Sequence, residues 1–326
     1  MQRVRIDETR GVACLFVVAF HAIASDPATS AGIVGYLSAS LVYVRMPLFM
    51  VITGYLFGCR APVSIGIAEI LRKRLLRLLL PFLVLTIVCW VIDHAARVHS
   101  SLLHALLYGS WHLWYLQALM LITLVYVPFE ALAKPSANAI LVLAIGAALF
   151  SSTDLAASTL LFSIDRAVGI APFFLFGVWL GRDAMAIDRR TVRLTLYAAA
   201  LVGFVVEQLA MHGIGAAWSK TSLIASCVGA GAAVFLLRNT PRLTTLATLG
   251  RYSFPIYLWH LPWFAATSFF FLHPLAIVGA WSVALRIVVG LVAPIVLLET
   301  VRRRDVLPLI LIGDGGIRHR AAPARS

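Results

Sequence analysis

Apolar residues recur in long stretches along the whole chain, and short polar segments between them hold most of the charged residues. Stretches of roughly 15 to 25 residues suit helices that cross a hydrocarbon layer about 30 Å thick. Hydropathy predicts ten transmembrane helices, at 11–25, 36–58, 78–95, 112–131, 138–152, 166–181, 192–211, 221–237, 253–272 and 275–299. The expected fold is therefore all-α, a polytopic membrane protein.

The composition agrees with this pattern and excludes an ordinary soluble domain. Of the 326 residues, 61% are hydrophobic and 13% are charged, whereas soluble domains carry about 25% charged residues. The formal net charge of +13 would suggest nucleic acid as the partner of a soluble protein. In a membrane protein the location of that charge decides what it means.

The positive residues lie almost entirely on one side of the predicted membrane. With the predicted spans, the connections on the side of the N-terminus hold 22 of the 27 Lys and Arg residues, and the opposite connections hold 3. Because Lys and Arg gather on the cytoplasmic side, both termini are predicted to be cytoplasmic, in the inner or plasma membrane. The lipid bilayer is then the expected partner, and nucleic acid is not.

The organisation along the chain predicts a single membrane domain. Basic residues, an apolar run and Ala22-Ile23-Ala24 resemble a cleavable signal, but His21 interrupts the apolar run and cleavage would reverse the charge alternation. We therefore predict a transmembrane domain over 1–302 and a basic, disordered cytoplasmic tail over 303–326. Segment 65–77 is predicted as a short surface helix before Pro81 enters the third span. The four cysteines lack metal-ligand spacing, so no metal site is predicted.

His21 is the first candidate for chemistry, because an ionisable residue deep in a span is costly to keep there. It follows Arg10 by eleven residues, which is about 16 Å along a helix. One interpretation is a packed histidine bonded to a backbone carbonyl, and the other is a base or nucleophile near neutral pH. Asp26 would orient the imidazole if the chain bends after the span.

Arg45 is the second candidate, since it lies inside the second span beside Pro47. An unpaired guanidinium in lipid costs several kcal/mol, so Arg45 must meet an anion or line a wet cavity. The acids within or at the ends of spans are its possible partners: Asp93, Glu130, Glu207 and Glu299.

Two further groups of residues suggest ligand binding. Arg74 and Arg77 would share a helix face, and paired guanidinium groups suit a phosphate or pyrophosphate, although the same residues also anchor a span. The aromatic residues suit an interfacial belt or the face of a sugar ring. Those proposed for substrate contact are Trp111, Trp114, Tyr115 and Tyr257, together with His260.

Taken together, these segments resemble the acyltransferase 3 family of integral-membrane O-acyltransferases. Five motifs follow in order. Arg10 with His21 is like the family's arginine, ten residues, histidine motif, and 46–56 is like its Phe-Phe-x-x-Ser-Gly-Phe-Leu block. Segments 74–77, 113–116 and 250–260 are like its Arg-x-x-Arg, Trp-Phe-Leu and Ser-Tyr-x-Ile-Tyr-Leu-x-His blocks. Thr53 replaces the usual serine, and Met50 stands where an aromatic residue is common.

The resemblance implies transfer of an acyl group, expected to be acetyl, from cytoplasmic acetyl-CoA or another acyl-CoA to a hydroxyl of a sugar or glycan. Arg10, Arg74 and Arg77 would lie near the phosphates of this co-substrate, and no tightly bound cofactor is expected. His21 would act as a base or carry the acyl group itself, with Arg45 as a candidate donor to the oxyanion.

Two other functions stay open at this stage. A transporter or flippase would use His21, Arg45 and Glu207 as a substrate or proton pathway. A non-catalytic subunit of an assembly that makes envelope polymers would not need His21 at all.

Overall fold

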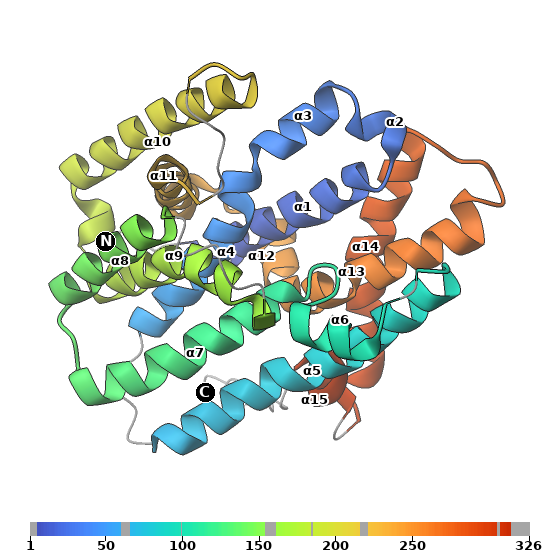
Figure 1. Cartoon of the computed structure of the whole chain (residues 1–326), viewed down its shortest axis with the longest axis horizontal. Helices are drawn as coiled ribbons and strands as arrows, with labels where there is room; N and C mark the ends of the chain where they lie inside the picture. Colours follow the sequence, from blue (N-terminus) through green and yellow to red (C-terminus); the bar gives the residue numbers. More distant parts are fainter. Residues whose placement is uncertain are drawn as a thin grey trace, which may run out of the picture.

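The computed structural model describes residues 5–59, 66–98, 100–153, 161–183, 185–215, 221–304 and 307–313. These residues form helices joined by turns and contain no strand, which confirms the predicted all-α fold. Figure 1 shows α1 (Ile6–Ala24) and α4 (Val42–Gly58) near the middle of the bundle, and α10 (Arg190–Met211) at its periphery.

Helices occupy the predicted spans but differ in how well they suit a membrane. Six helical stretches among the described residues are long and apolar enough to cross one. Four of them are single helices: α5 (Ile67–Ala95), α7 (Trp114–Ala133), α10 and α14 (Ala280–Val301). The other two are Ile33–Gly58, made of α3 (Ile33–Ser40) and α4, and Leu161–Arg182, which contains α9 (Ile164–Arg182).

The remaining predicted spans are occupied by less typical helices. The helices α8 (Ala137–Ser151) and α11 (Leu223–Asn239) are apolar but shorter. Acidic and basic residues occupy the first turns of α1, so its apolar part is shorter than the helix. The α-helical part of α13 (Ser253–Thr267) has 15 residues, and the chain continues as a π-helical turn, η4 (Ser268–Leu272). Membrane-spanning helices are thus established, while the count of ten and the cytoplasmic side of the termini stay predictions.

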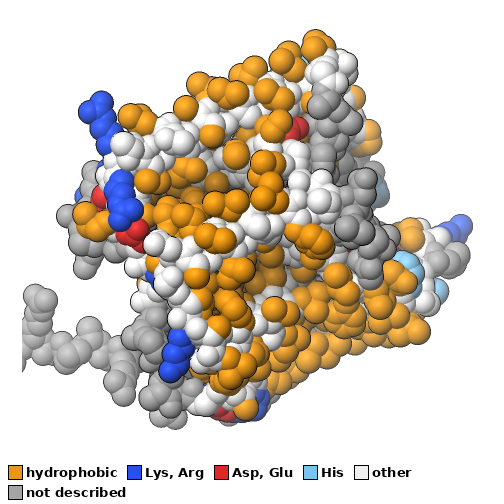
Figure 2. Space-filling view, turned by 60° about the vertical axis from the view of Figure 1, so that its left-hand side comes forward, with side chains coloured by type: hydrophobic (Ala, Val, Ile, Leu, Met, Phe, Trp, Pro, Cys, Tyr) orange, Lys and Arg blue, Asp and Glu red, His pale blue; other side chains and the backbone are white. Residues whose placement is uncertain are grey.

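Short helices complete the described structure: α2 (Pro27–Ser30), α6 (Leu102–Tyr108), α12 (Thr244–Arg251) and α15 (Leu307–Ile312), with the 3-10 turns η2 (Leu161–Ser163) and η3 (Ala186–Asp188). The outward faces of the long helices remain apolar. Val142 on α8, Leu201 on α10 and Trp281 on α14 are all largely exposed. Figure 2 shows the resulting broad hydrophobic surface, with Lys and Arg gathered toward its edges, as contact with lipid requires.

Glycines bring α4 and α9 into close contact. Gly54 and Gly58 on α4 face α9, and Gly177 and Gly181 on α9 face α4. A Cβ atom added at Gly54 would lie 2.0 Å from the carbonyl oxygen of Phe174, and at the other three positions it would meet the facing backbone at 2.2 to 2.4 Å. Spacing of small residues every four positions lets helix backbones pack closely in membranes. These four glycines therefore set the close approach of α4 and α9.

A second glycine contact sets the position of α1. A Cβ atom at Gly11 would lie 2.1 Å from the carbonyl oxygen of Leu246, and one at Gly250 would lie 1.8 Å from that of Asp7. The start of α1 therefore lies directly on α12. Since α13 follows α12 with one residue between them, this contact also places α13 beside α1.

The predicted short surface helix at 65–77 is wrong for the described residues, because α5 runs unbroken from Ile67 to Ala95 through Pro81. Glu69 pairs with Arg72 and Lys73 one turn later, which supports the helix at its exposed start. Proline removes one helical hydrogen bond, and membrane helices tolerate this where neighbours pack against them. At 29 residues, α5 is longer than the apolar layer requires.

Part of the predicted disordered tail is also ordered. Leu307–Ile312 forms α15, which packs on α5. The indole Nε1 of Trp259 donates to the carbonyl oxygen of Leu311 at 2.8 Å, and Ile312 is 1% exposed. The run Leu307-Pro308-Leu309-Ile310-Leu311-Ile312 is apolar, so burying it outweighs the basic character of the surrounding tail. Residues 314–326 lie outside the described part.

Candidate active site

A cavity of about 450 Å³ lies at one end of the helix bundle. Its walls come from the last third of α1, the first halves of α4, α9 and α11, the start of α7, and α13. These helix ends share one side of the bundle, opposite to the start of α1. The polar side chains that line the cavity are His21, Tyr43, Arg45, His112, Asp165, Arg166, Thr221 and Tyr257.

Three histidines meet beside this cavity. The ring centroids of His21 and His260 are 5.2 Å apart, those of His112 and His260 are 4.9 Å apart, and those of His21 and His112 are 6.5 Å apart. The described residues include no group of three His, Cys, Asp or Glu placed to hold a metal ion. The cluster therefore offers imidazole nitrogens rather than a ligand set.

The tautomers of two of these rings follow from their carbonyl partners. Nδ1 of His260 lies 3.0 Å from the carbonyl oxygen of Ile256 and 2.8 Å from that of Tyr257. Because a carbonyl oxygen only accepts, Nδ1 must carry the proton, and in the neutral imidazole Nε2 then holds a lone pair. By the same reasoning His112 is protonated at Nε2, which lies 3.1 Å from the carbonyl oxygen of Leu258. Both remaining nitrogens, His260 Nε2 and His112 Nδ1, are buried and have no hydrogen-bond partner.

Arg45 projects into the same cavity without a carboxylate partner in the described residues. Its Nη1 donates to the carbonyl oxygen of Ser38 at 2.9 Å, and its guanidinium carbon lies 3.5 Å from the centre of the Phe20 ring. The sequence predicted that Arg45 would either meet an anion or line a cavity, and the structure shows that it lines the cavity. A guanidinium over an aromatic face gains a cation–π attraction but keeps donors for a ligand.

The predicted acid partners of Arg45 all bind other groups, so that prediction is wrong. Glu207 accepts from Tyr43 Oη at 2.9 Å and from Ser222 Oγ at 2.7 Å. Asp93 accepts from Trp111 Nε1 at 3.1 Å. Glu299 lies 3.3 Å from Arg302 Nη1 and accepts from Tyr252 Oη at 2.7 Å.

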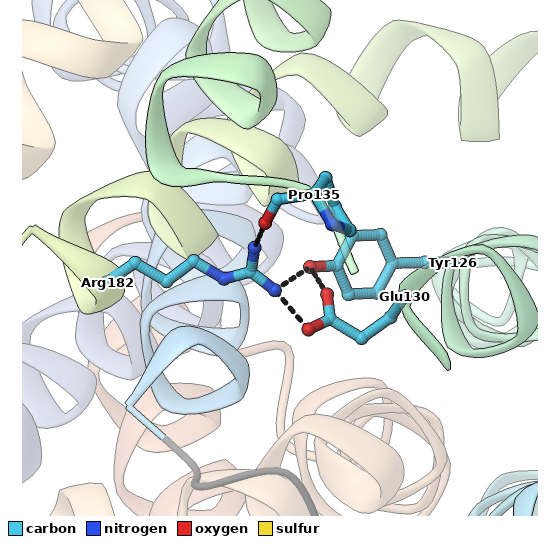
Figure 3. Close-up of polar contacts among 4 residues, drawn as sticks. All are labelled: Tyr126, Glu130, Pro135 and Arg182. Atoms are coloured by element: carbon cyan, nitrogen blue, oxygen red, sulfur yellow. Dashed lines mark hydrogen bonds and ion pairs between the residues drawn. The ribbon is translucent and has the colours of Figure 1, made fainter. Parts of the chain in front are cut away.

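Glu130, the fourth acid, forms a polar cluster that joins the ends of α7 and α9 (Figure 3). Arg182 pairs with Glu130, donates to the carbonyl oxygen of Pro135, and lies 3.4 Å from Tyr126 Oη. Tyr126 also donates to Glu130. The cluster fixes two helices at the end remote from the cavity.

Asp26 does not face His21 but fastens the loop after α1. It accepts from Thr29 N and Thr29 Oγ1, both at 2.9 Å, and from Gly279 N at 3.0 Å. Burial raises the pKa of this carboxyl, but the donated hydrogen bonds outweigh it and leave the pKa below its ordinary value. The carboxylate thus caps α2 and ties it to the turn before α14.

The arginines predicted to bind the donor gather at the opposite end of α1. Arg10 is close enough to Arg77 for the two to interact electrostatically. The Arg74 guanidinium lies 3.7 Å from the centre of the Phe57 ring, and that of Arg77 lies 5.8 Å from the centre of the Phe254 ring. The starts of α1, α5 and α13 and the end of α4 therefore converge here, on the side away from the cavity.

The residues predicted to contact substrate lie in four different positions. Trp114 and Tyr257 line the cavity. Tyr115 is 6% exposed and lies behind Tyr257, at 5.4 Å between ring centroids. Trp111 turns away to Asp93, and His260 is fully buried beside His21.

The structure adds residues that the sequence did not single out. His112 lies within a run of tryptophans and a tyrosine that is typical of a membrane interface, so its pattern gave no separate signal. Asp165 and Arg166 begin α9 and line the cavity, and the Arg166 guanidinium lies 5.0 Å from the centre of the Trp114 ring. Their charges stand just outside an apolar run, where they suggest nothing more than a helix start.

The comparison with known families agrees with this arrangement. The family model described as an acyltransferase domain, acyltransferase 3, matches residues 3–299 of the 326-residue chain. The chain belongs to the acyltransferase 3 family, as the order of its motifs predicted. No curated protein and no solved structure matches it.

Proposed function

We propose that this protein is an O-acyltransferase that moves an acyl group, acetyl in the simplest case, from acyl-CoA to a hydroxyl of a sugar or glycan. One observation carries the proposal. Arg10 and His21 lie on the same helix, with Arg10 within electrostatic range of Arg77 at one end of the bundle and His21 on the cavity wall. The charge distribution supports a cytoplasmic arginine end, on the side where CoA esters are made, and a location in the inner or plasma membrane.

The arginine end supplies the donor site. Arg10, Arg74 and Arg77 would hold the phosphates of the CoA, because guanidinium groups match phosphate oxygens with paired, charge-assisted hydrogen bonds. The thioester would then reach toward His21, about 16 Å along α1 from Arg10. The acyl-CoA is a co-substrate in this scheme, and no tightly bound cofactor is required.

His21 is the proposed catalytic residue, and two routes use it. In the first, an imidazole nitrogen takes the proton from the acceptor hydroxyl while its oxygen attacks the thioester carbonyl, and the CoA thiolate leaves. In the second, the imidazole attacks the thioester itself, CoA leaves, and the acceptor hydroxyl then takes the acyl group from nitrogen. The second route needs only one substrate at the imidazole at a time.

The cavity supplies the acceptor site and a group for the developing oxyanion. Its volume of about 450 Å³ lies within the usual range of ligand pockets. Trp114 and Tyr257 offer aromatic faces to a sugar ring. Arg45 is the proposed donor to the oxyanion, since a cation without a carboxylate partner in a desolvated site stabilises developing negative charge strongly.

A transporter or flippase is the second candidate. The observation that favours it is that His21, Arg45 and the Glu207-bound Tyr43 all border one cavity. A transporter would move its substrate without consuming acyl-CoA.

Binding of acetyl-CoA by purified protein tests the donor site. Arg77→Ala is expected to weaken binding about tenfold or more, because a charge-assisted hydrogen bond contributes about 1.5 to 3 kcal/mol. Arg72→Ala is the matched control, since it removes an arginine from the same helix that pairs with Glu69 instead. Equal binding by wild type and Arg77→Ala contradicts the donor site, and no binding by folded wild-type protein favours transport.

A further inference from the structure

His260 carries an unused lone pair in the middle of the histidine cluster. Its Nδ1 proton is committed to two carbonyl oxygens of its own helix, and its Nε2 is buried without a partner. The residue is 0% exposed. A buried polar atom without a partner costs about 1 to 3 kcal/mol, so its retention calls for a role.

His21 is the neighbouring group that can donate a hydrogen bond to this lone pair. The His260 ring is the closer of the two neighbouring histidines, at 5.2 Å against 6.5 Å for His112. A ring-centroid separation of 5.2 Å suits an N–H···N hydrogen bond between two imidazoles whose nitrogens face each other. His260 lies behind His21 and does not line the cavity, whereas His112 does.

We propose that His260 is a positioning residue that accepts the N–H of His21 at its Nε2. The hydrogen bond fixes His21 in one tautomer and leaves the lone pair of its other nitrogen facing the cavity, where the acyl transfer takes place. Fixing the tautomer of a catalytic histidine through the partner of its second nitrogen is a general device. Here the partner is a neutral imidazole whose own tautomer is locked by Ile256 and Tyr257.

The arrangement predicts different roles for His260 and His112. His260 holds His21 from behind and needs an acceptor atom at its Nε2 position. His112 lines the cavity and does not share this role. Replacing the acceptor atom by carbon should therefore harm the chemical step, while an amide oxygen at the same place should restore part of it.

The assignment to His260 rests on the proposed function for its kinetic readout, so the test has two arms. In the first, acyl transfer is measured for His260→Phe and His260→Gln, with His273→Phe as the control at an exposed histidine of the same region. His260→Phe is expected to lower kcat about 10- to 100-fold with the KM for acetyl-CoA unchanged, and His260→Gln to recover much of that loss. Equal kcat in wild type and folded His260→Phe overturns the assignment.

In the second arm, ¹⁵N-histidine NMR of the purified protein reports the tautomer of His21 without any substrate, and His21→Asn identifies its signals. One tautomer in wild type and a mixture in His260→Phe supports the assignment, whereas a mixture in wild type contradicts it. If wild type transfers no acyl group, the proposed function fails, and this arm still decides the role of His260.

Discussion

Arg10 and His21 lie on one helix at opposite ends of the bundle, Arg10 within electrostatic range of Arg77 and His21 on the cavity wall. The eleven-residue offset between them corresponds to about 16 Å. This spacing separates a site suited to phosphate from a site suited to proton or acyl transfer, and α1 keeps the two in fixed relation.

Loss of the Arg45 guanidinium should slow the chemical step without affecting the donor site. If Arg45 stabilises the oxyanion, Arg45→Gln should lower kcat about 100-fold, as the removal of an oxyanion donor does in other acyl transfers. Arg45→Lys should retain part of the activity because it keeps the positive charge. Steady-state kinetics checks this, and a raised KM for acetyl-CoA with normal kcat would contradict the assigned role.

Asp26→Ala should cost stability but not catalysis, since Asp26 binds Thr29 and Gly279 rather than His21. Loss of a capping carboxylate typically costs about 1 kcal/mol. Thermal unfolding in detergent measures the change. A selective loss of kcat in a variant of normal stability would show that Asp26 orients His21 after all.

The same carboxylate predicts a pH dependence of stability. Its folded pKa lies below the ordinary value of 3.8, so its contribution is complete above that value and is lost as pH falls through the folded pKa. The stability difference between wild type and Asp26→Asn should therefore shrink in acid below pH 3.8. A difference that stays constant across this range would show that the charge of Asp26 contributes nothing.

Enlarging the glycines between α4 and α9 should disrupt the bundle. Gly177→Val places side-chain atoms on the backbone of Val51 and is expected to cost several kcal/mol, above the usual 1 to 3 kcal/mol for overpacking, because backbone cannot move aside easily. Gly146→Ala on α8 is the matched control, since its added Cβ meets nothing within 4 Å. Similar unfolding temperatures for both variants would contradict the proposed packing.

Much of the fold was predictable because lipid imposes a simple rule on sequence. Apolar runs located the helices. The continuity of α5 through Pro81 and the docking of α15 were not predictable, because both depend on neighbours that hydropathy does not describe. Local pattern alone favoured a break at the proline and disorder in a basic tail.

The candidate site was predictable only in part, for a similar reason. His21 and Arg45 stood out because charge in an apolar span is costly. Their partners came from distant segments, so the acids proposed for Arg45 and the role proposed for Asp26 could not be tested by spacing along the chain. The cluster of His21, His112 and His260 arises because α1 and the turn before α7 both pack on α13, and no single segment shows it.

The most direct measurement of the central claim is transfer of radiolabelled acetyl from acetyl-CoA to a panel of glycans by purified protein in liposomes, comparing wild type with His21→Ala. Wild-type protein should label an acceptor hydroxyl, and folded His21→Ala should not. Transfer that persists without His21 would show that His21 is not the catalytic residue.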